Sequence, residues 1–381
     1  MADAQHFARV LKKYRKERGL TQGELAEKLL VSAQSVSIWE NGKGMPDLMH
    51  LCDLAKILSV SLDVLLDNRP DEVRSFIGID GGGTKTEFVL IDETGRKLNS
   101  IILGGCNPNT CGIEAVVQTL CQGIDYFHPE EMKVCGVYLG GAGMGSGNNA
   151  QAVIAALEKA YPNLKFGCGN DIQNVIACCS EPDNCIAAIS GTGCVVFSSV
   201  NGTIRRTGGA GYLFEGSGSG YDLGRDAIKA ALQDRDETGP ETILTGLVEE
   251  KLGGGVWEHI HDLYKQDVSY IASFAVLVSQ AAQQGDKVAC EIMERSSEYA
   301  ANLIRVALKK TPGIKNIIVS GSLYAKSDLF FGQVTEKLPL DLIVERLTWP
   351  PVWGACLQCA KLCQVEQLPS LQVFLNSDNE Q

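Results

Sequence analysis

Residues 75–92 read SFIGIDGGGTKTEFVLID, and this stretch decides the fold of the larger part of the chain. Its first half predicts a buried strand that ends at Asp80 and runs into three glycines, and the residues from Glu87 to Asp92 predict a second strand. A strand, a glycine turn and a strand form a hairpin. Dinucleotide-binding fingerprints and P-loops need a helix directly after their glycines, so the stretch fits neither of these motifs.

The glycine turn predicts a phosphate site. Residues 81–83 carry no side chains, so backbone N–H groups can approach phosphate oxygens there, and Thr84 adds a hydroxyl donor. Asp80, at the strand end, is placed to hold a magnesium ion through water. A bare hairpin turn is the alternative explanation of one triple glycine. The predicted phosphate-binding residues are Gly82, Gly83, Thr84 and Lys85.

The same pattern recurs further along the chain. Residues 186–189 predict a buried strand, a second glycine turn follows it, and residues 194–200 predict another strand. Two such hairpins facing each other would clamp the phosphates of a nucleotide from both sides. A third strand-to-glycine junction, at Gly321, suits the approach of adenosine. Chance explains any one of these loops, but three in this order predict a nucleotide site. The predicted ligands in the second turn are Ser190, Gly191, Thr192 and Gly193.

The composition is that of a large globular protein. The 381 residues are 45% hydrophobic and 21% charged, which excludes wholesale disorder and predicts two or three domains. No apolar run reaches the roughly 18 residues of a membrane span. The N-terminus lacks the pattern of a secretion signal, so we expect a cytoplasmic protein without a membrane partner. The 14 cysteines lie mainly in apolar segments and predict reduced, buried thiols. Cys356, Cys359 and Cys363 have the spacing of a metal motif, but a buried helix face explains them better.

The N-terminal segment differs from the rest in charge and in pattern. The net charge of the chain is −12, yet residues 1–70 hold 10 Lys and Arg against 9 Asp and Glu. An acidic body repels DNA phosphates, so any nucleic-acid contact must come from this segment. Apolar residues recur there at helical spacing and predict five short helices that pack as one bundle. The predicted helix starts are a capping box at Thr21 and Glu24, a cap at Ser32, Pro46, and Ser61.

Residues 7–66 resemble the helix-turn-helix domain of the Xre/Cro type of phage and bacterial repressors. The matching stretches include Leu20-Thr21-Gln22 and Ser35-Val36-Ser37-Ile38-Trp39-Glu40-Asn41-Gly42. The resemblance implies a homodimer on a double-stranded DNA operator, with the helix over 33–40 in the major groove. It departs from the family at Leu30, where the turn usually has glycine. A helical dimerisation module is the alternative. The implied DNA-binding residues are Ser32, Gln34, Ser35 and Ser37 around the base edges, and Gln22 and Lys43 on phosphates.

Residues 75–365 resemble the actin, Hsp70 and sugar-kinase superfamily, and within it the BadF/BadG-type ATPases and N-acetylglucosamine kinases. The motifs that carry this likeness lie at 78–86, 104–109, 140–143, 170–171, 190–193 and 351–355. The resemblance implies two ribonuclease-H-like lobes, ATP with Mg²⁺, and an amino sugar such as N-acetylglucosamine. It makes Asp171 the general base, although Asp171 also suits a helix cap. The implied sugar-binding residues are Asn107, Asp171, Gly209 and Glu215, and the alternative for Asn107 is a turn residue.

The departures from this family lie in the sugar pocket. Its kinases usually carry Gly-Gly-Trp-Gly and then Gly-Asp-Glu-Gly-Ser, whereas here Ala210 stands at the aromatic position and Gly216 at the aspartate position, next to Glu215. Two hypotheses follow: an ATP-dependent amino sugar kinase that carries a DNA-binding module, or a sugar or nucleotide sensor with little turnover. An iron–sulfur ATPase activator of an acyl-CoA dehydratase is a third, weaker alternative.

The sequence therefore predicts a multidomain protein, in which an all-α five-helix helix-turn-helix bundle precedes an α/β two-lobed ribonuclease-H-like, actin-like ATPase fold. The predicted boundaries are a DNA-binding domain over 1–67, a linker over 68–74, an N-terminal lobe over 75–185, a C-terminal lobe over 186–370 and a polar tail over 371–381.

Overall fold

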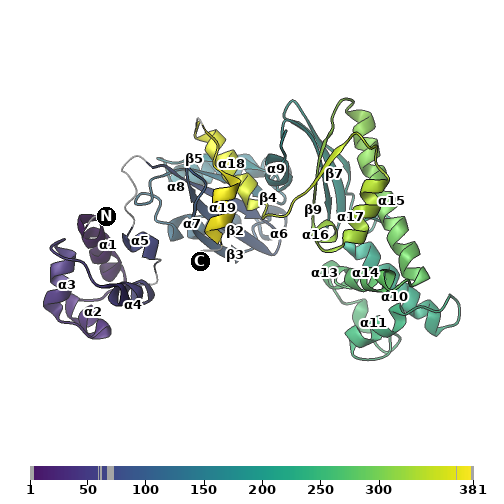
Figure 1. Cartoon of the computed structure of the whole chain (residues 1–381), viewed down its shortest axis with the longest axis horizontal. Coiled ribbons are helices and arrows are strands. Elements are labelled where there is room, and N and C mark those ends of the chain that lie inside the picture. Colours follow the sequence, from purple (N-terminus) through teal and green to yellow (C-terminus); the bar gives the residue numbers. More distant parts are fainter. Residues whose placement is uncertain (1–3, 59, 61, 67–72, 366, 379–381) are drawn as a thin grey trace.

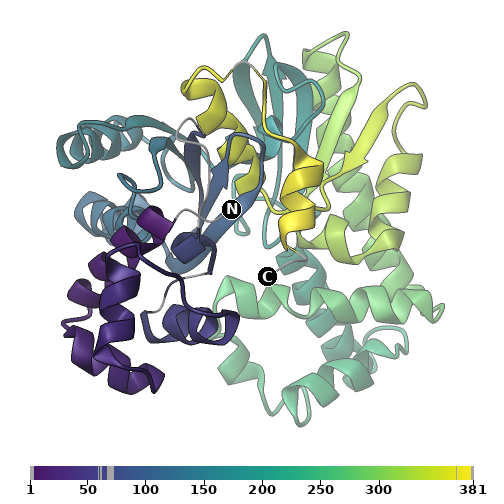
Figure 2. The ribbon, with the colours of Figure 1, turned by 60° about the vertical axis from the view of Figure 1, so that its left-hand side comes forward.

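The computed structural model describes residues 4–58, 60, 62–66, 73–365 and 367–378, and these form three parts (Figure 1). A small helical module comes first, and two lobes follow, each built on a five-stranded sheet. In both views the module lies beside the first lobe, and the long helix α15 (Lys287–Lys310) of the second lobe lies on the opposite side of the molecule (Figure 1, Figure 2). The predicted fold class is confirmed. Ser61 and residues 68–72 of the predicted linker lie outside the described residues.

The helical module has one shared core. Helices of this length are marginal on their own in water, so each must bury its apolar face against the others. Phe7, Leu11, Leu25, Val36 and Leu54 are fully buried in this core. The helices are α1 (Ala4–Glu17), α2 (Gln22–Leu29), α3 (Ala33–Glu40), α4 (Leu48–Leu58) and α5 (Leu62–Leu66).

Local side chains start the helices of the module. The Thr21 hydroxyl accepts the N–H of Glu24, and the Glu24 carboxylate accepts the N–H of Thr21 at 2.7 Å, so the predicted capping box is confirmed. The Ser32 hydroxyl accepts the N–H of Ser35 at 3.0 Å and caps α3, also as predicted. Helix α4 begins at Leu48 rather than at Pro46, because the carboxylate of Asp47 accepts the N–H of His50 at 2.9 Å.

The first lobe is a mixed sheet with helices on both faces. Its strand order is β3-β2-β1-β4-β5, with antiparallel pairs among the first three strands and parallel pairs from β1 to β5. Alternate residues of β1 serve opposite faces: Ile77 and Ile79 pack with α7 and α8, while Phe76 packs with α18. The strands are β1 (Ser75–Gly81), β2 (Lys85–Asp92), β3 (Lys97–Gly104), β4 (Val134–Gly141) and β5 (Lys165–Gly169), and the helices are α6 (Pro108–Cys111), α7 (Ile113–Tyr126), α8 (Asn149–Ala160) and α18 (Val352–Leu362).

The second lobe repeats the strand arrangement of the first. Its sheet order is β10-β9-β6-β7-β8, so β6 takes the place of β1 and again forms an antiparallel hairpin with the next strand. Helix α15 packs on one face of this sheet, and α9 on the other. The strands are β6 (Asn184–Ser190), β7 (Cys194–Val200), β8 (Thr203–Gly208), β9 (Asn316–Ser320) and β10 (Ile343–Arg346). The helices are α10 (Gly220–Arg235), α11 (Leu244–Leu252), α12 (Ile260–Leu263), α13 (Val268–Ala272), α14 (Ala275–Gln283), α16 (Ser322–Lys326) and α17 (Asp328–Glu336).

The chain passes between the two sheets twice. It leaves the first lobe after α9 (Ile172–Ala177), which lies between the sheets in Figure 1, and it returns after β10 through α18. Helix α18 packs on β1, β2 and β4, where its apolar residues share a buried cluster with Phe76, Val89 and Tyr138. The C-terminal lobe therefore does not extend to residue 370 as predicted. The predicted polar tail is also wrong, because α19 (Leu371–Asp378) is a helix that buries Phe374 against Trp353.

The helical module touches the first lobe through α1. The rings of Tyr14 and His128 meet edge to face with their centroids 5.0 Å apart, and the Lys13 ammonium pairs with the carboxylate of Glu131. Tyr14 is buried by this contact and by its own module. Across the described segments, none of the helices combines the length and the apolar character needed to cross a bilayer.

Candidate functional site

A cavity of about 330 Å³ opens beside the junction of the two lobes. Asp171, which follows the last strand of the first sheet, lines it together with the glycine turn after β6 in the second sheet. We call this the interlobe cavity. The predicted site residues that line it are Asp171, Gly191, Thr192, Gly193, Gly209 and Glu215.

Asp171 is a helix cap and a cavity residue at once. Its Oδ1 accepts the N–H of Ile172 at 2.9 Å at the start of α9, and its side chain remains accessible from the cavity. Desolvation by the surrounding protein raises the pKa of this carboxyl above its ordinary value, while the hydrogen bond from Ile172 acts in the opposite direction. Solvent that reaches the carboxyl through the cavity limits the size of the shift. Both predicted roles of Asp171 are thus compatible with its position.

Asp80 is clamped by an amide that the sequence reading missed. The fully buried Asn174 donates from Nδ2 to Oδ1 of Asp80 at 2.7 Å, and the same nitrogen lies 3.3 Å from the carbonyl oxygen of Gly140. Gly140 must be glycine here, because a Cβ at that position would lie 2.0 Å from Oδ1 of Asn174. Asn174 belongs to α9, so this contact ties the helix of Asp171 to the end of β1.

The charge environment of Asp80 suits a cation. Desolvation raises the pKa of its carboxyl to about 6, the hydrogen bond from Asn174 opposes this, and the neighbouring charge of Asp171 adds to it. A cation near these two carboxylates would stabilise their ionised forms. Magnesium is usually held by one or two carboxylates and keeps several waters, so the residues present fit the predicted role of Asp80. Within the described residues, no group of three or more His, Cys, Asp or Glu side chains is arranged as a metal site.

The glycine turn after β1 leaves donors free. The N–H of Gly82 closes the hairpin on the carbonyl oxygen of Lys85 at 2.9 Å, and its carbonyl accepts the N–H of Cys106 at 3.0 Å. Gly83, Thr84 and Lys85 are exposed. The structure therefore has the predicted hairpin with an open turn. These residues do not line the interlobe cavity. They are connected to it indirectly: Asp80 accepts a hydrogen bond from Asn174 of α9, and Asp171 at the start of α9 lines the cavity.

The glycine turn after β6 contacts the start of α10. The carbonyl oxygen of Gly191 accepts the N–H of Gly220 at 2.7 Å, so the turn rests on the start of that helix with Thr192 exposed. Thr192 also lines a second cavity of about 400 Å³, bounded by α13, α14 and α16. Gly321 packs against the backbone of Ser190, while the next residue, Ser322, faces this second cavity. Two cavities thus meet at one threonine of the turn.

The predicted sugar-binding residues divide into two sets. Gly209 and Glu215 line the interlobe cavity, and the Glu215 carboxylate accepts the N–H of Gly209. Asn107 does not line it. Its Oδ1 accepts the N–H of Asn109 at 3.0 Å at the start of α6, which supports its alternative role as a turn residue. Cys356 and Cys359 lie buried on α18 and Cys363 is buried at its C-cap, as the helix-face explanation predicted.

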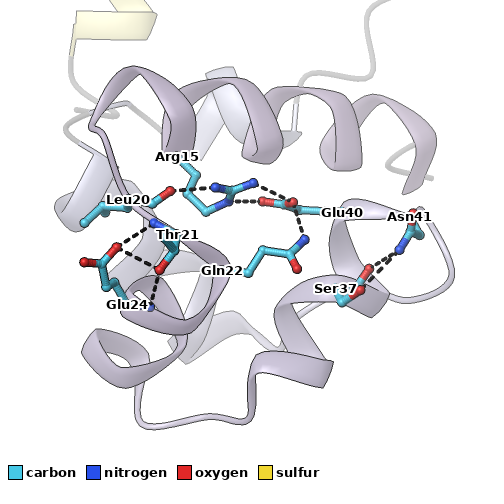
Figure 3. A network of polar contacts seen from close by, with 8 residues as sticks. All are labelled: Arg15, Leu20, Thr21, Gln22, Glu24, Ser37, Glu40 and Asn41. Atoms are coloured by element: carbon cyan, nitrogen blue, oxygen red, sulfur yellow. Dashed lines mark hydrogen bonds and ion pairs between the residues drawn. The ribbon is translucent and has the colours of Figure 1, made fainter.

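The helix-turn-helix module presents its predicted contacts on an exposed face. Ser32, Gln34 and Lys43 are exposed, and Ser35 and Ser37 are half-buried. Gln22 takes part in a polar network with Glu40, whose Oε2 accepts from Nε2 of Gln22 at 2.7 Å (Figure 3). The other residues of the predicted set carry no comparable tie to the module's core.

The centre of that network is a buried ion pair that the sequence reading missed. Nε of Arg15 lies 2.5 Å from Oε1 of Glu40, and both residues are buried, with exposed fractions of 8% and 7% (Figure 3). Nη1 of Arg15 also donates to the carbonyl oxygen of Leu20 at 2.6 Å. Desolvation alone would raise the pKa of Glu40, but the hydrogen bonds from Arg15 and Gln22 outweigh it and hold the pKa below its usual value. The pair fixes α3 against α1.

Comparison with known proteins agrees with this architecture. The family model for BadF/BadG/BcrA/BcrD ATPases matches residues 77–338, which is more than half of the chain. The chain belongs to this ATPase family. A helix-turn-helix model matches residues 11–65 in addition, so the family's ATPase domain here follows a DNA-binding module.

Individual relatives point in the same direction. An N-acetyl-D-glucosamine kinase of Dictyostelium discoideum is 28% identical over 310 residues, covering 74% of this chain and 96% of the relative. An N-acetylmuramic acid/N-acetylglucosamine kinase of Clostridium acetobutylicum is 30% identical over 229 residues, covering 58% of this chain and 75% of the relative. The solved structure of a ROK family transcriptional regulator, a homologue of the E. coli MLC protein, has a TM-score of 0.54 at 13% identity and covers 100% of this chain and 99% of its own, which shows a shared fold.

Proposed function

We propose that this member of the family is a cytoplasmic DNA-binding regulator whose two lobes bind ATP and an amino sugar such as N-acetylglucosamine. The lobes transfer the γ-phosphoryl group from ATP to the sugar. The observation that carries the proposal is the interlobe cavity, where Asp171 and the Gly191–Gly193 turn face the same space. Two similar proteins are named as N-acetylglucosamine kinases, which supports the choice of sugar. The second cavity at Thr192 is the place for adenosine.

The chemistry follows from the positions of the side chains. Asp171 takes the proton from a sugar hydroxyl, and the oxygen of that hydroxyl forms a bond to the γ-phosphorus of ATP while ADP leaves. The raised pKa of Asp171 brings its basicity closer to neutral pH than that of an ordinary aspartate. Free N–H groups in the two glycine turns bind phosphate oxygens. Asp80 would hold Mg²⁺ through water, and the ion supplies charge neutralisation of the phosphates.

A second function, sensing without turnover, rests on Glu215. Glu215 is the acidic residue next to Gly216, which stands at the family's sugar-binding aspartate position. Its carboxylate already accepts the N–H of Gly209 and is therefore engaged within its own loop. Ala210 stands at the aromatic position of the family pattern, so the sugar site lacks the large side chain that the family has there. In this case the sugar binds and ATP is not consumed.

An ADP-release assay with the full chain distinguishes the two functions. We would supply N-acetylglucosamine or N-acetylmuramic acid with ATP and Mg²⁺ and compare the wild type with Asp171→Asn. Asparagine caps a helix as well as aspartate does, so this variant removes the base and keeps α9. For a kinase we expect kcat to fall by about 10²–10⁴-fold with little change in KM. If calorimetry shows sugar binding but the wild type releases no ADP, the protein is a sensor. If neither sugar nor ATP binds, the proposed function is wrong.

The link to DNA is also a proposal. Helix α1 meets the first lobe at Tyr14 and His128, so closure of the lobes around a ligand would move the DNA-binding module relative to its partner in a homodimer. A coupling of about 1–3 kcal/mol, ordinary for allosteric proteins, changes operator affinity roughly 5- to 150-fold. The test is the operator affinity of the full chain at fixed salt, with and without amino sugar and ATP. An unchanged affinity under saturating ligand would refute the coupling.

A further inference from the structure

The exposed face of α3 carries one large apolar side chain among small and polar ones. Gln34, Ile38 and Asn41 follow one another at i, i+4 and i+7, which places them on one side of the helix, while Val36 and Trp39 point into the core. Ile38 is 41% exposed, and the sequence reading did not select it. Ile38 does not belong to the core of the module, so its exposed part is available for a contact with another molecule.

The side chain of Ile38 has little conformational freedom and is partly exposed. It is β-branched and sits in a helix, so its side chain has essentially one χ1 rotamer and loses little freedom when it binds. On one side it lies close to the loop after α3, because a Cβ at Gly44 would come within 3.2 Å of Cγ2 of Ile38. The exposed part of the residue faces solvent. A rigid apolar group of this kind gains free energy when a second apolar group covers it.

The neighbours of Ile38 define the polar part of the same surface. Nδ2 of Asn41 donates to the carbonyl oxygen of Ser37 at 2.7 Å and lies 3.3 Å from its hydroxyl oxygen (Figure 3). The Ser37 hydroxyl thus accepts from Asn41 and keeps its own hydrogen for an outside acceptor. The surface therefore offers a hydroxyl donor beside an apolar patch.

We propose that Ile38 is a specificity-determining residue of the DNA-binding module and contacts the 5-methyl group of a thymine in the major groove. The recognition helix of a helix-turn-helix module lies in that groove, and the thymine methyl is the only apolar group that a base edge presents there. Ser37, one residue before, donates to an acceptor on a neighbouring base. The inference rests on the DNA-binding part of the proposed function and is independent of the kinase part.

The test removes the methyl group from the DNA and the side chain from the protein. Duplexes are first selected from a random pool with the full chain, and each dT of the selected site is then replaced by dU, which differs only in that methyl. Affinity is measured by fluorescence anisotropy at one salt concentration, since phosphate contacts make it salt-dependent. For the wild type we expect one dT per half-site whose replacement weakens binding about 4-fold, the value for burying one methyl group.

Two variants assign this effect to Ile38. Ile38→Ala should bind the dT and dU duplexes equally, and Ile38→Val, which keeps the branched Cβ, should retain most of the difference. Leu30→Ala is the matched control, because Leu30 is also an exposed apolar residue of the module but lies outside α3, and it should behave as the wild type. The proposal is overturned if Ile38→Ala keeps the dT preference or if no dT replacement affects the wild type. If the full chain selects no duplex at all, the DNA-binding assignment fails and this inference fails with it, while the ADP-release assay still tests the kinase part.

Discussion

Leu30 occupies a backbone conformation that suits glycine. At the C-terminal end of α2 its φ and ψ are 57° and 36°, in the left-handed region, and its side chain is 93% exposed. For a residue with a Cβ this conformation costs about 1–2 kcal/mol. The turn to α3 nevertheless needs it, because the N–H of Val31 must reach the carbonyl oxygen of Ala26. We therefore predict that Leu30→Gly stabilises the helix-turn-helix module.

The size of the effect follows from two opposing terms. Relief of the left-handed strain contributes about 1–2 kcal/mol, and the larger freedom of glycine in the unfolded chain removes about 0.4–1 kcal/mol. The loss of a side chain that is 93% exposed forfeits almost no burial. The net stabilisation is about 0.5–1 kcal/mol, which corresponds to roughly a 2- to 5-fold smaller population of the locally opened module.

Hydrogen exchange in the full chain measures this population. Amides of α2 and α3 that exchange through local opening should exchange about 2- to 5-fold more slowly in Leu30→Gly, while amides of the lobes keep their wild-type rates. Leu30→Ala is the control, because alanine removes the same exposed atoms but keeps the left-handed strain, so its rates should stay near those of the wild type. The reasoning is refuted if the glycine variant exchanges no more slowly than the alanine variant.

Three further outcomes follow from contacts in the structure. Glu40→Gln removes the charge that pairs with buried Arg15 and should destabilise the module by about 3–5 kcal/mol in thermal unfolding. Because the folded-state pKa of Glu40 is lowered, the wild type should lose this stabilisation only as the pH falls below the ordinary glutamate value. The variant should lack this pH dependence. Asn174→Ala leaves Asp80 without its amide donor and should weaken Mg²⁺-dependent binding of a fluorescent ATP analogue about 10-fold or more, whereas Gln173→Ala on the same helix should not. Phe374→Ala should destabilise the first lobe by about 3–5 kcal/mol in denaturant unfolding, and an unchanged midpoint would show that α19 does not support that lobe.

The features that could be predicted from the sequence are those with local causes. Each glycine hairpin follows from apolar runs interrupted by Gly81–Gly83 or Ser190–Gly193, and the capping box follows from Thr21 and Glu24 three residues apart. Such patterns need no knowledge of the distant chain. Asp171 also belongs here, because its place between a strand and a helix is visible in the sequence.

Features that depend on distant partners could not be predicted in the same way. Arg15 and Glu40 are 25 residues apart, and Asn174 and Asp80 are 94 apart, so no spacing rule joins them. Asn107 is a predicted sugar-binding residue, and its Oδ1 accepts the N–H of Asn109 at the start of its own helix, a local contact that the sequence allowed as the alternative. Ile38 is different, because the i, i+4 spacing from Gln34 was present in the sequence and would have placed both on one helix face.

The seat of α18 on the first sheet has a consequence for synthesis. A nascent chain emerges N-terminus first, and the core of the helical module is complete once residue 66 has been made. The face of the first sheet that carries Phe76 and Val89, in contrast, stays uncovered until Val352–Leu362 has been synthesised. A stalled translation product would thus carry a folded helix-turn-helix module joined to a lobe with an exposed apolar face. Chaperones and proteases act on such partly folded chains.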